Sequence, residues 1–417
     1  MADPLQLKVA VVGAGVSGLI AARELQREGH RVIIFEKSDK IGGLWVYDPR
    51  TESDPLSHEM VHSSLYFSLR TNLPRALMGF SDFAFSDREY GDPRDFPGHP
   101  EVAAYLNDFA TRFGLAELVQ FNSEVVRVEA VGGRLDEWVV EWRSEGGVNS
   151  EEQVFDAVVV CNGHITVPRL AHIPGIEKWP GKQIHSHNYR VPEPFKDQVV
   201  VVIGNGASAY DISRDISTVA KEVHISSRDP AVKYSKLPHH PNIWQHSAIY
   251  TAEEDGTIEF QDGSSVQASI ILHCTGYKYE VPFLKTNGIV TIDDNRVGPL
   301  YKHVFPPQLA PRLSFVGLPQ KVIIFNMMEL QSKWIARVLS GRVCLPSEEE
   351  MMADVKEYYQ EMTALKRPTH LTHYLLNCEE VSHLFSLLFL FFFLVLNYDL
   401  RLSYLKQQQT HLSLHNV

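Results

Sequence analysis

The sequence predicts an α/β protein with two Rossmann-like dinucleotide-binding domains, because one pattern occurs twice in the chain. In each occurrence an apolar run, at residues 9–12 and again at residues 199–203, leads into a glycine-rich turn and then a helical stretch. Such glycines let the backbone approach a pyrophosphate, and the helix N-terminus supplies N–H donors and the positive end of its dipole. One such turn is a weak signal, whereas two in one chain indicate two dinucleotides that exchange electrons.

The two turns are similar in sequence. The first consists of Gly13, Ala14, Gly15, Val16, Ser17 and Gly18. The second consists of Gly204, Asn205, Gly206, Ala207, Ser208 and Ala209. After the first turn we expect a helix over residues 19–28, with Gly29 at its C-terminal end, and then a strand over residues 32–35.

The residue that follows the second strand of each unit distinguishes the two sites. In the first unit it is Glu36, whose carboxylate accepts hydrogen bonds from a ribose 2′-OH and repels a 2′-phosphate. Counting equally far from Gly204 reaches Ser227, with Arg228 next, and a guanidinium favours a 2′-phosphate. The first site is therefore predicted to hold FAD and the second NADPH; the alternative for Arg228 is a solvated surface residue.

Length, charge and cysteine usage narrow the class of protein. A chain of 417 residues is long enough for two or three domains. The net charge of −12 disfavours a nucleic-acid partner. Four scattered cysteines without a CxxC pair argue against a structural zinc site and a dithiol redox centre, and we expect no metal. No signal peptide is evident, so a reducing, cytoplasmic location is expected.

The order of the motifs predicts how the chain is divided. Residues 1–165 are expected to form the first part of the FAD-binding domain, and residues 166–285 the NADPH-binding domain. Residues 286–375 would then return to the FAD-binding domain. The other predicted elements are strands at 121–130, 137–143, 154–161, 223–226, 269–274 and 312–316 and helices at 100–113, 329–339 and 348–365. Residues 50–100 are expected to form a long ordered loop.

Further residues are expected to touch the two cofactors. A Gly-Gly pair soon after Glu36 lets backbone lie close to a flat or anionic ligand. Two predicted strands, at 154–161 and 269–274, end in similar glycine-containing segments where the backbone would pass near a cofactor. The residues concerned are Lys37, Gly43, Leu44, Trp45, Thr275 and Gly276. The alternative for Trp45 is a core aromatic.

The tail, residues 376–417, differs in character from the rest of the chain. Residues 384–396 are nearly all Leu and Phe, and these thirteen residues fall short of the roughly 20 that span a bilayer as a helix. Three interpretations are an interfacial anchor, a buried helix and an aberrant end without selected structure. The last is preferred, so membrane contact through this run is not favoured.

Several motifs together resemble the flavin-containing monooxygenases, a group of the class B flavin-dependent monooxygenases. The segment 179–190 matches the family motif Phe-x-Gly-x-x-x-His-x-x-x-Tyr/Phe-Lys/Arg at Gly181, His185, Tyr189 and Arg190, with Trp179 in place of Phe. The related Baeyer–Villiger enzymes carry Trp where Tyr189 stands. Residues 274–277 are similar to the family's Ala-Thr-Gly-Tyr, and residues 69–74 resemble the plant subgroup that S-oxygenates methylthioalkyl glucosinolates.

The resemblance covers about residues 1–375 and implies both an architecture and a chemistry. In the family NADPH reduces FAD, O₂ then forms a C4a-hydroperoxyflavin, and a soft nucleophile takes one oxygen atom. The implied partners are O₂ and a small thioether or amine, with a sulfoxide as the expected product. Asn72 corresponds to an active-site Asn of the family; the alternative is a turn-forming Asn close to Pro74. Ser208 is expected to cap its helix and reach a phosphate.

Other functions remain as alternatives. An N-hydroxylating or Baeyer–Villiger enzyme would share the same cofactors. A disulfide oxidoreductase would need two nearby cysteines beside the flavin, and no such pair comes soon after the first turn. The atypical tail leaves a third alternative from another class, an inactive truncated remnant without a catalytic role. His185 is expected either to hydrogen-bond across the link between the domains or to be a structural histidine.

Overall fold

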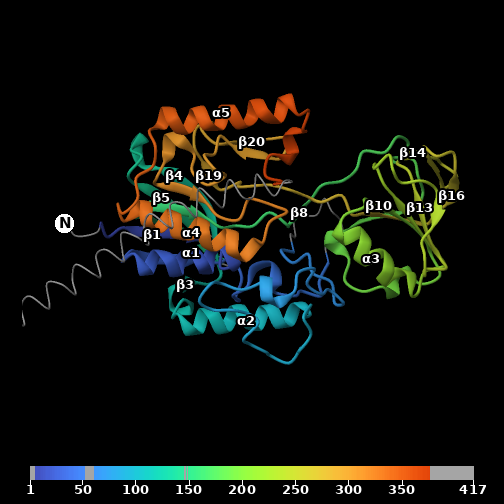
Figure 1. Ribbon diagram of the computed structural model, residues 1–417, viewed down its shortest axis with the longest axis horizontal. Coiled ribbons are helices and arrows are strands. Elements are labelled where there is room, and N and C mark those ends of the chain that lie inside the picture. The colour runs from blue at the N-terminus through green and yellow to red at the C-terminus, as the bar shows by residue number, and fades with distance from the viewer. Residues whose placement is uncertain (1–4, 52–60, 145–146, 148, 376–417) are drawn as a thin grey trace, which may run out of the picture.

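The chain forms two modules at opposite ends of an elongated molecule, joined by extended segments that cross between them (Figure 1). The computed structural model describes residues 5–51, 61–144, 147 and 149–375. The predicted apolar run at 384–396 therefore lies outside the described residues. The larger module contains α1, α2, α4 and α5, and the smaller one contains α3 (Figure 1).

The larger module is built on a parallel sheet that begins the chain. Its five strands are ordered β22-β7-β1-β2-β3, and every neighbouring pair is parallel. The nearly continuous apolar sequences of the central strands fit a sheet covered on both faces. The bounds are β1 (Lys8–Val12), β2 (Arg31–Phe35), β3 (Val119–Gln120), β7 (Ala157–Val160) and β22 (Leu313–Phe315).

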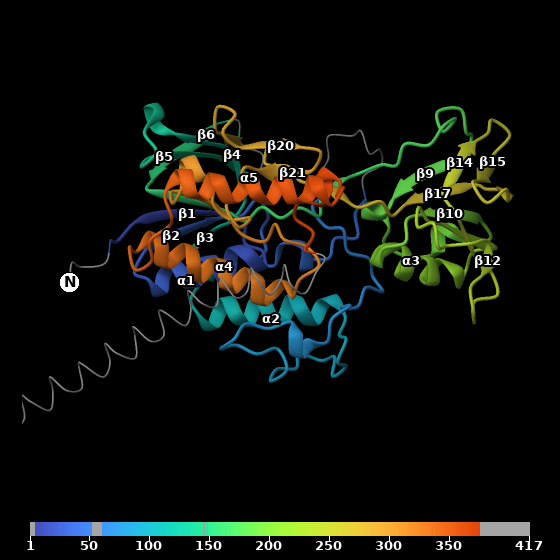
Figure 2. The same ribbon diagram turned by 45° about the horizontal axis from the view of Figure 1, so that its top comes forward.

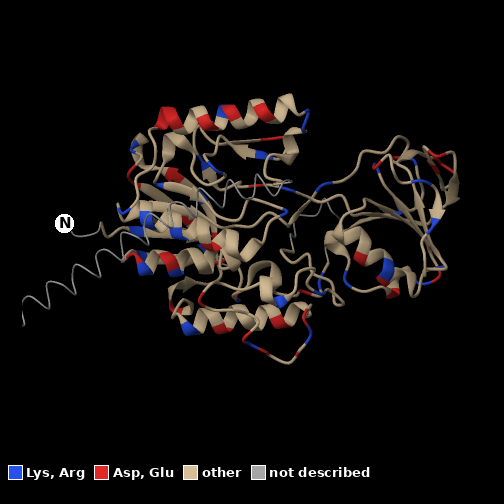
Figure 3. Cartoon of the chain, in the orientation of Figure 1, with Lys and Arg blue, Asp and Glu red and all other residues tan. Residues whose placement is uncertain are grey.

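Helices cover this module on two sides. Helices α1 (Val16–Arg27) and α4 (Ile324–Leu339) pack against each other, whereas α2 (His99–Arg112) and α5 (Glu348–Ala364) lie on opposite sides of the module in both views (Figure 2). A capping box between Ser347 and Glu350 begins α5. Acidic side chains gather in its first turn (Figure 3), where the helix dipole favours them.

A second, antiparallel sheet in the larger module has the order β19-β4-β5-β6. The expected single strand at 154–161 is wrong, because the structure has two strands there, β6 and β7, separated at Asp156. The carboxylate of Asp156 accepts a hydrogen bond from Lys8 N at 2.6 Å, which fixes the break. The bounds are β4 (Ser123–Ala130), β5 (Trp138–Ser144), β6 (Ser150–Phe155) and β19 (Leu284–Lys285).

The smaller module repeats the parallel-sheet plan. Its sheet has the order β12-β13-β11-β10-β17-β9, and α3 (Ala207–Ser217) follows β10. A three-stranded antiparallel sheet of β14, β15 and β16 adjoins it. The bounds are β9 (Lys182–His185), β10 (Val199–Ile203), β11 (Glu222–Ser226), β12 (Ser235–Lys236), β13 (Ile243–His246), β14 (Ile249–Ala252), β15 (Thr257–Phe260), β16 (Ser265–Gln267) and β17 (Ile270–His273).

Two short strands mark the crossing between the modules. Strand β8 (Val167–Pro168) enters the smaller module and pairs with β18 (Tyr277–Lys278), which leaves it. The chain then re-enters the larger module at β19, where the hairpin of β20 (Thr291–Asp293) and β21 (Arg296–Gly298) follows. Both crossings lie next to each other, so the smaller module is an insertion in the larger one.

A buried ion network holds the helical layer of the larger module together. The Arg23 guanidinium on α1 is 2% exposed and lies 2.6 Å from Glu24 and 3.1 Å from Glu329 on α4. It also pairs with Asp82, and it lies over the ring of Phe109 on α2. A buried guanidinium needs this many partners because an unpaired charge there would be strongly destabilising.

Candidate functional site: two dinucleotide turns

The first glycine-rich turn lies between β1 and α1 at the carboxyl edge of the sheet. Gly13 N donates to Phe35 O at 2.8 Å, and a Cβ at Gly13 would lie 2.6 Å from Cys161 O. No side chain caps α1, although Val16 and Ser17 in its first turn are buried. The turn therefore offers uncapped N–H groups at a close-packed backbone, as a pyrophosphate requires.

The second turn, between β10 and α3, repeats this geometry. Gly204 N donates to Ser226 O at 2.9 Å, and a Cβ at Gly204 would lie 2.5 Å from Cys274 O. The helix N-cap is Gly206, without a side-chain hydrogen bond. The expectation that Ser208 caps this helix is wrong, because Ser208 lies inside α3 rather than before it.

Glu36 occupies the predicted place at the end of β2 and is held there firmly. Its side chain is buried. One carboxylate oxygen accepts from Ala14 N at 2.8 Å, and the other accepts from Ser38 N and Oγ at 2.9 and 2.8 Å. A carboxylate has about four acceptor positions, so capacity for a ribose hydroxyl remains. Lys37 follows at an exposed position.

The equivalent place in the second unit is taken by Ser227. The hydrogen bond from Gly204 N to Ser226 O corresponds to that from Gly13 N to Phe35 O, which aligns Ser227 with Glu36. Ser227 is buried, and its Oγ accepts from Asp229 N at 3.1 Å. Arg228 is exposed and has no hydrogen bond or ion pair with another described residue. Its guanidinium is available to an incoming anion.

The Gly-Gly segment covers the first turn, as a cofactor-binding loop would. Gly42 N donates to Ala14 O at 3.1 Å, and the short helix η1 (Gly43–Trp45) follows. Gly43 packs on Gly15 so closely that a Cβ on Gly43 would lie 2.9 Å from the Gly15 Cα. Leu44 and Trp45 are half-buried, and Trp45 packs against the main hydrophobic core. Trp45 therefore has core contacts whether or not it touches the flavin.

A cavity of about 1140 Å³ lies between η1 and the N-terminal half of α2. Of the site residues predicted from the sequence, Trp45 lines this cavity and Asn72 does not. The walls are formed by parts of segments 39–47, 67–70, 90–94 and 98–107 together with Phe121. The cavity is thus next to the loop that covers the first turn.

Asn72 lies on an exposed loop whose neighbours are fixed. Thr71 N donates to Pro97 O at 2.9 Å, and Thr71 Oγ1 donates to Leu73 O at 2.8 Å. The Asn72 side chain itself makes no hydrogen bond with the described part of the chain. The turn is therefore held by Thr71, so the amide of Asn72 is left available for a ligand.

The family-like motif at 179–190 lies where the modules meet. Arg190 is buried; its guanidinium donates to Asp48 O at 2.6 Å and to Ser63 O at 2.8 Å in the larger module. His185 accepts from His187 N at 3.0 Å through Nδ1, and burial lowers the pKa of His185 to about 3. His185 is therefore neutral and holds its own turn through Nδ1, and Arg190 makes bonds that cross between the modules.

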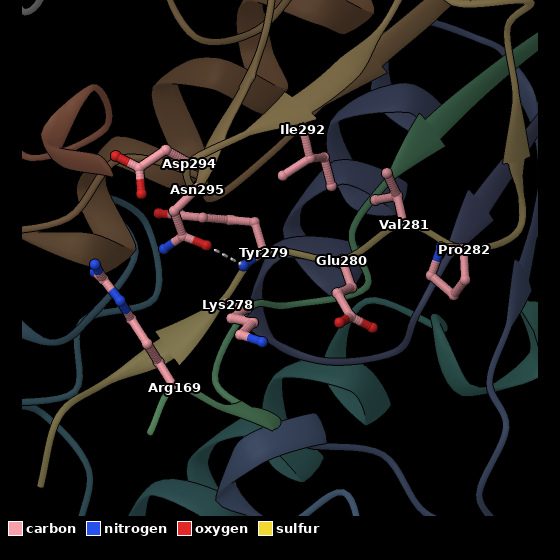
Figure 4. A pocket seen from close by; sticks show the side chains of 9 residues that line it. All are labelled: Arg169, Lys278, Tyr279, Glu280, Val281, Pro282, Ile292, Asp294 and Asn295. Atoms are coloured by element: carbon pink, nitrogen blue, oxygen red, sulfur yellow. Dashed lines mark hydrogen bonds between the residues drawn. The ribbon is translucent and has the colours of Figure 1, made fainter. Parts of the chain in front are cut away.

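Thr275 and Gly276 hold the crossing segment. Arg169 N donates to Gly276 O at 3.0 Å, and Thr275 Oγ1 donates to Arg169 O. A smaller cavity of about 490 Å³ opens beside this crossing (Figure 4). There Tyr279 N donates to Asn295 Oδ1 at 2.8 Å, and the acidic side chains of Asp294 and Glu280 and the basic side chains of Lys278 and Arg169 line the opening.

Neither buried thiol is suited to nucleophilic or metal chemistry. Burial raises the pKa of Cys161, and it raises the pKa of Cys274 to about 12, so both thiols are protonated at neutral pH. Over the residues that the structure describes, no group of three His, Cys, Asp or Glu side chains could hold a metal ion. None of the helices in the same part of the chain is both long and apolar enough to cross a membrane.

Comparison with known proteins identifies the family. The model of the family described as "Flavin-binding monooxygenase-like" matches residues 6–245 and 241–401. The chain belongs to this family. Flavin-containing monooxygenase FMO GS-OX5 of Arabidopsis thaliana is 60% identical over 376 residues, which cover 88% of this chain and 81% of the relative. Flavin-containing monooxygenase FMO GS-OX-like 2 of the same plant is 58% identical over 376 residues, covering 88% and 80%.

Solved structures agree with this assignment. The S-allyl-L-cysteine S-oxygenase of Allium sativum superimposes with a TM-score of 0.88 at 54% identity, covering 92% of this chain and 89% of that one. Cyclohexanone monooxygenase, at 14% identity and a TM-score of 0.63, shares the fold, covering 91% of this chain and 97% of its own. The predicted class B architecture with two Rossmann-like domains is confirmed, and this flavin monooxygenase uses FAD and NADPH.

Sequence reasoning missed residues that join the modules. Tyr66, Asp211 and Asp215 were not singled out, yet each takes part in a hydrogen bond between the larger module and α3. The spacing of the two aspartates, four residues apart on one helix, places them on one face of α3. That spacing was visible in the sequence, but the segment it faces is not deducible from spacing alone.

Proposed function

We propose that this flavin monooxygenase transfers one oxygen atom from O₂ to a thioether sulfur, with a methylthioalkyl glucosinolate-like compound as the substrate class. The reaction balances as sulfide, O₂, NADPH and a proton giving sulfoxide, NADP⁺ and water. The observation that carries the proposal is the 54% identity and TM-score of 0.88 with an S-allyl-L-cysteine S-oxygenase. An amine is the second small-molecule candidate.

The two turns would hold the two cofactors. The close-packed first turn fits the pyrophosphate of FAD, and Glu36, with its remaining acceptor capacity, fits the ribose. Gly43, Leu44 and Trp45 would cover the cofactor from the side of η1. When bound, the flavin supplies the redox chemistry, since it accepts electrons from NADPH and activates O₂.

The second turn would bind NADPH by charge. Its uncapped helix N-terminus fits a pyrophosphate. Ser227, where the first unit has a carboxylate, does not repel a 2′-phosphate, and the exposed guanidinium of Arg228 attracts one. Thr275 and Gly276 would line the cofactor from the crossing segment.

Asn72 is the proposed active-site residue. Its amide has both donor and acceptor atoms and no described hydrogen-bond partner, so it is available to hold the reacting group. Asn72 would orient that group by hydrogen bonding and would not act as a proton source, because an amide does not titrate in the physiological range.

The test is to reduce the purified chain with NADPH without oxygen, and then to add O₂ and methyl p-tolyl sulfide. We expect about one sulfoxide per NADPH consumed. Oxidation of NADPH without sulfoxide contradicts the proposal, and product from a cyclic ketone or an amine instead of the sulfide indicates one of the alternative activities.

The Asn72→Asp variant tests the proposed site. It keeps the size of the side chain but adds a negative charge and removes the amide donor. We expect it to keep its flavin and its reduction by NADPH but to lose sulfoxide formation by about 100-fold or more, as when a single preorganised donor is removed. Asn287→Asp, at another exposed loop position, is the matched control. Normal sulfoxide yield from Asn72→Asp would refute the role.

A further inference from the structure

A set of side-chain hydrogen bonds joins the larger module directly to helix α3. Ser68 Oγ donates to the Asp215 carboxylate at 2.6 Å, and Tyr66 OH donates to Asp211. Tyr189 OH, from the family-like motif, donates to the same Asp215 oxygen at 2.6 Å. Two carboxylates one turn apart on α3 therefore receive three hydroxyl groups, two of which come from the 66–68 segment.

Tyr66 itself is packed into the smaller module as well as hydrogen-bonded to it. The Tyr66 and Tyr189 side chains are buried, with ring centroids 5.4 Å apart, and Tyr66 belongs to the hydrophobic core of the smaller module. Phe67 N donates to Arg190 O at 2.8 Å. Burial, with the hydrogen bond to Asp211 adding to it, raises the pKa of Tyr66, so its hydroxyl remains a donor at neutral pH.

The other end of the same segment is fixed to the larger module. His99 N, at the beginning of α2, donates to Leu69 O at 3.2 Å, and Thr71 N donates to Pro97 O at 2.9 Å. The next residue along the chain is Asn72. The short stretch from Tyr66 to Thr71 thus connects the helix of the second dinucleotide turn to the loop that carries the proposed active-site amide.

We propose that Tyr66 and Ser68, through Asp211 and Asp215, are positioning residues that set the Asn72 loop against the NADPH module. This inference rests on the proposed function. Oxygen transfer needs reacting groups held within a fraction of an ångström, and it needs water kept out. The α3 bonds fix the loop on one module relative to the helix that binds the pyrophosphate on the other.

Loosening these hydrogen bonds should change where the oxygen atom goes, to sulfur or to H₂O₂. When the loop is held, NADPH and O₂ yield sulfoxide and water. When it is loosened, the same NADPH, O₂ and a proton yield NADP⁺ and H₂O₂ without transfer to sulfur. The ratio of sulfoxide to H₂O₂ therefore reports on the position of Asn72, whereas a loss of folding would lower both products together.

The test uses hydroxyl deletions that keep the shape of each side chain. Tyr66→Phe and Ser68→Ala are made singly and together, and Ser68→Thr restores the hydroxyl. Ser86→Ala is the matched control, because Ser86 Oγ donates to the Asp87 carboxylate at 3.0 Å at an exposed place within the larger module. Each variant is assayed for flavin content, melting temperature, rate of NADPH oxidation, and the ratio of sulfoxide to H₂O₂ from methyl p-tolyl sulfide.

We expect the double variant, which loses two hydrogen bonds to carboxylates, to lower the sulfoxide to H₂O₂ ratio by at least about tenfold, the size of losing one such bond. The rate of NADPH oxidation and the flavin content should match Ser86→Ala, and Ser68→Thr should restore the ratio of the Ser68→Ala variant. If the double variant does not retain flavin, the two single variants provide the test. Each is then expected to lower the sulfoxide to H₂O₂ ratio by less than the double variant would.

Two results would overturn the inference, and they are distinguishable. A wild-type chain that makes no sulfoxide contradicts the proposed function and this inference with it. A wild-type chain that makes sulfoxide, beside variants whose ratio is unchanged, contradicts the positioning role alone and leaves the proposed function intact.

Discussion

The two glycine-rich turns have the same backbone plan but differ in how tightly they are enclosed. At the third glycine of the first turn, Gly18, a Cβ would lie 1.8 Å from Gly13 O, whereas the second turn accommodates Ala209 at the equivalent place. Gly15 lies against Gly43 of the covering loop, whereas a Cβ on Gly206 would meet nothing within 4 Å. The first turn is closed on itself and covered, and the second is open.

The side chains proposed to recognise the two riboses differ in the same way, one being enclosed and the other open. Glu36 is buried and bonded to the turn before any ligand arrives, while Arg228 is exposed and unbonded among the described residues. A preorganised, enclosed site suits a cofactor that stays bound, and an open site with a free cation suits a cosubstrate that must enter and leave. Two copies of one motif can therefore be tuned for retention and for exchange.

The largest expected effect comes from making the first turn resemble the second. Gly18→Ala places a methyl group into Gly13 O, so we expect at least about 3 kcal/mol of destabilisation and loss of bound flavin. The reciprocal Ala209→Gly should cost about 1–2 kcal/mol and leave flavin in place. Flavin absorbance and thermal unfolding measure both. Equal effects of the two substitutions would mean that the turns are enclosed alike.

The next effect concerns the exposed cation. Arg228→Ala removes the proposed partner of the 2′-phosphate, so KM for NADPH should rise about 10- to 100-fold while KM for NADH is unchanged. Lys221→Ala, another exposed cation in the same module, is the control. Steady-state NADPH oxidation provides the measurement, and an unaltered KM for NADPH in Arg228→Ala would assign Arg228 to the solvated surface.

The smallest effect compares the modules through acid stability, because each contains a buried histidine pair. His303 and His373 lie 3.1 Å apart (Nδ1 to Nδ1) in the larger module, and His224 Nδ1 lies 2.9 Å from His246 Nε2 in the smaller one. Burial lowers the pKa of His303 and of His246 to about 4. The native state then binds fewer protons than the unfolded state, whose histidines have a pKa of about 6.5.

These histidines should therefore leave the free energy of unfolding unaffected above pH 6.5 and should lower it as the pH drops toward 4. The melting temperature is measured from pH 7.5 to 4.5. His246→Gln should reduce the acid-induced loss of stability of the smaller module and leave that of the larger module unchanged. A melting temperature that is constant across this range would show that these histidines titrate normally.

Much of the fold was predictable because the apolar pattern of these strands and helices lies within their own residues. The run at 199–203 matches β10, and the expected helix at 348–365 matches α5 within a residue. The helix expected at 329–339 begins earlier, at Ile324, because no capping side chain marks its start: the N-cap is Ile323 and no acidic residue lies in the first turn. The antiparallel strands β14–β16 were not predicted, since short half-exposed strands carry little periodicity.

The candidate site was predictable to the extent that it depends on motifs. The alignment of Ser227 with Glu36 follows from counting, and the structure reproduces it through equivalent backbone hydrogen bonds. The contacts of Tyr66 and Ser68 with α3 were not predictable, because they join residues about 145 positions apart. Only the tertiary fold brings such residues together.

The most direct test of the contrast between the two sites is anaerobic reduction of the bound flavin by NADPH and by NADH at equal concentrations. The buried acid of the first site and the exposed cation of the second predict that NADPH bleaches the flavin far faster, by about tenfold or more. Equal bleaching rates with the two nucleotides would contradict the assignment of the second turn to NADPH.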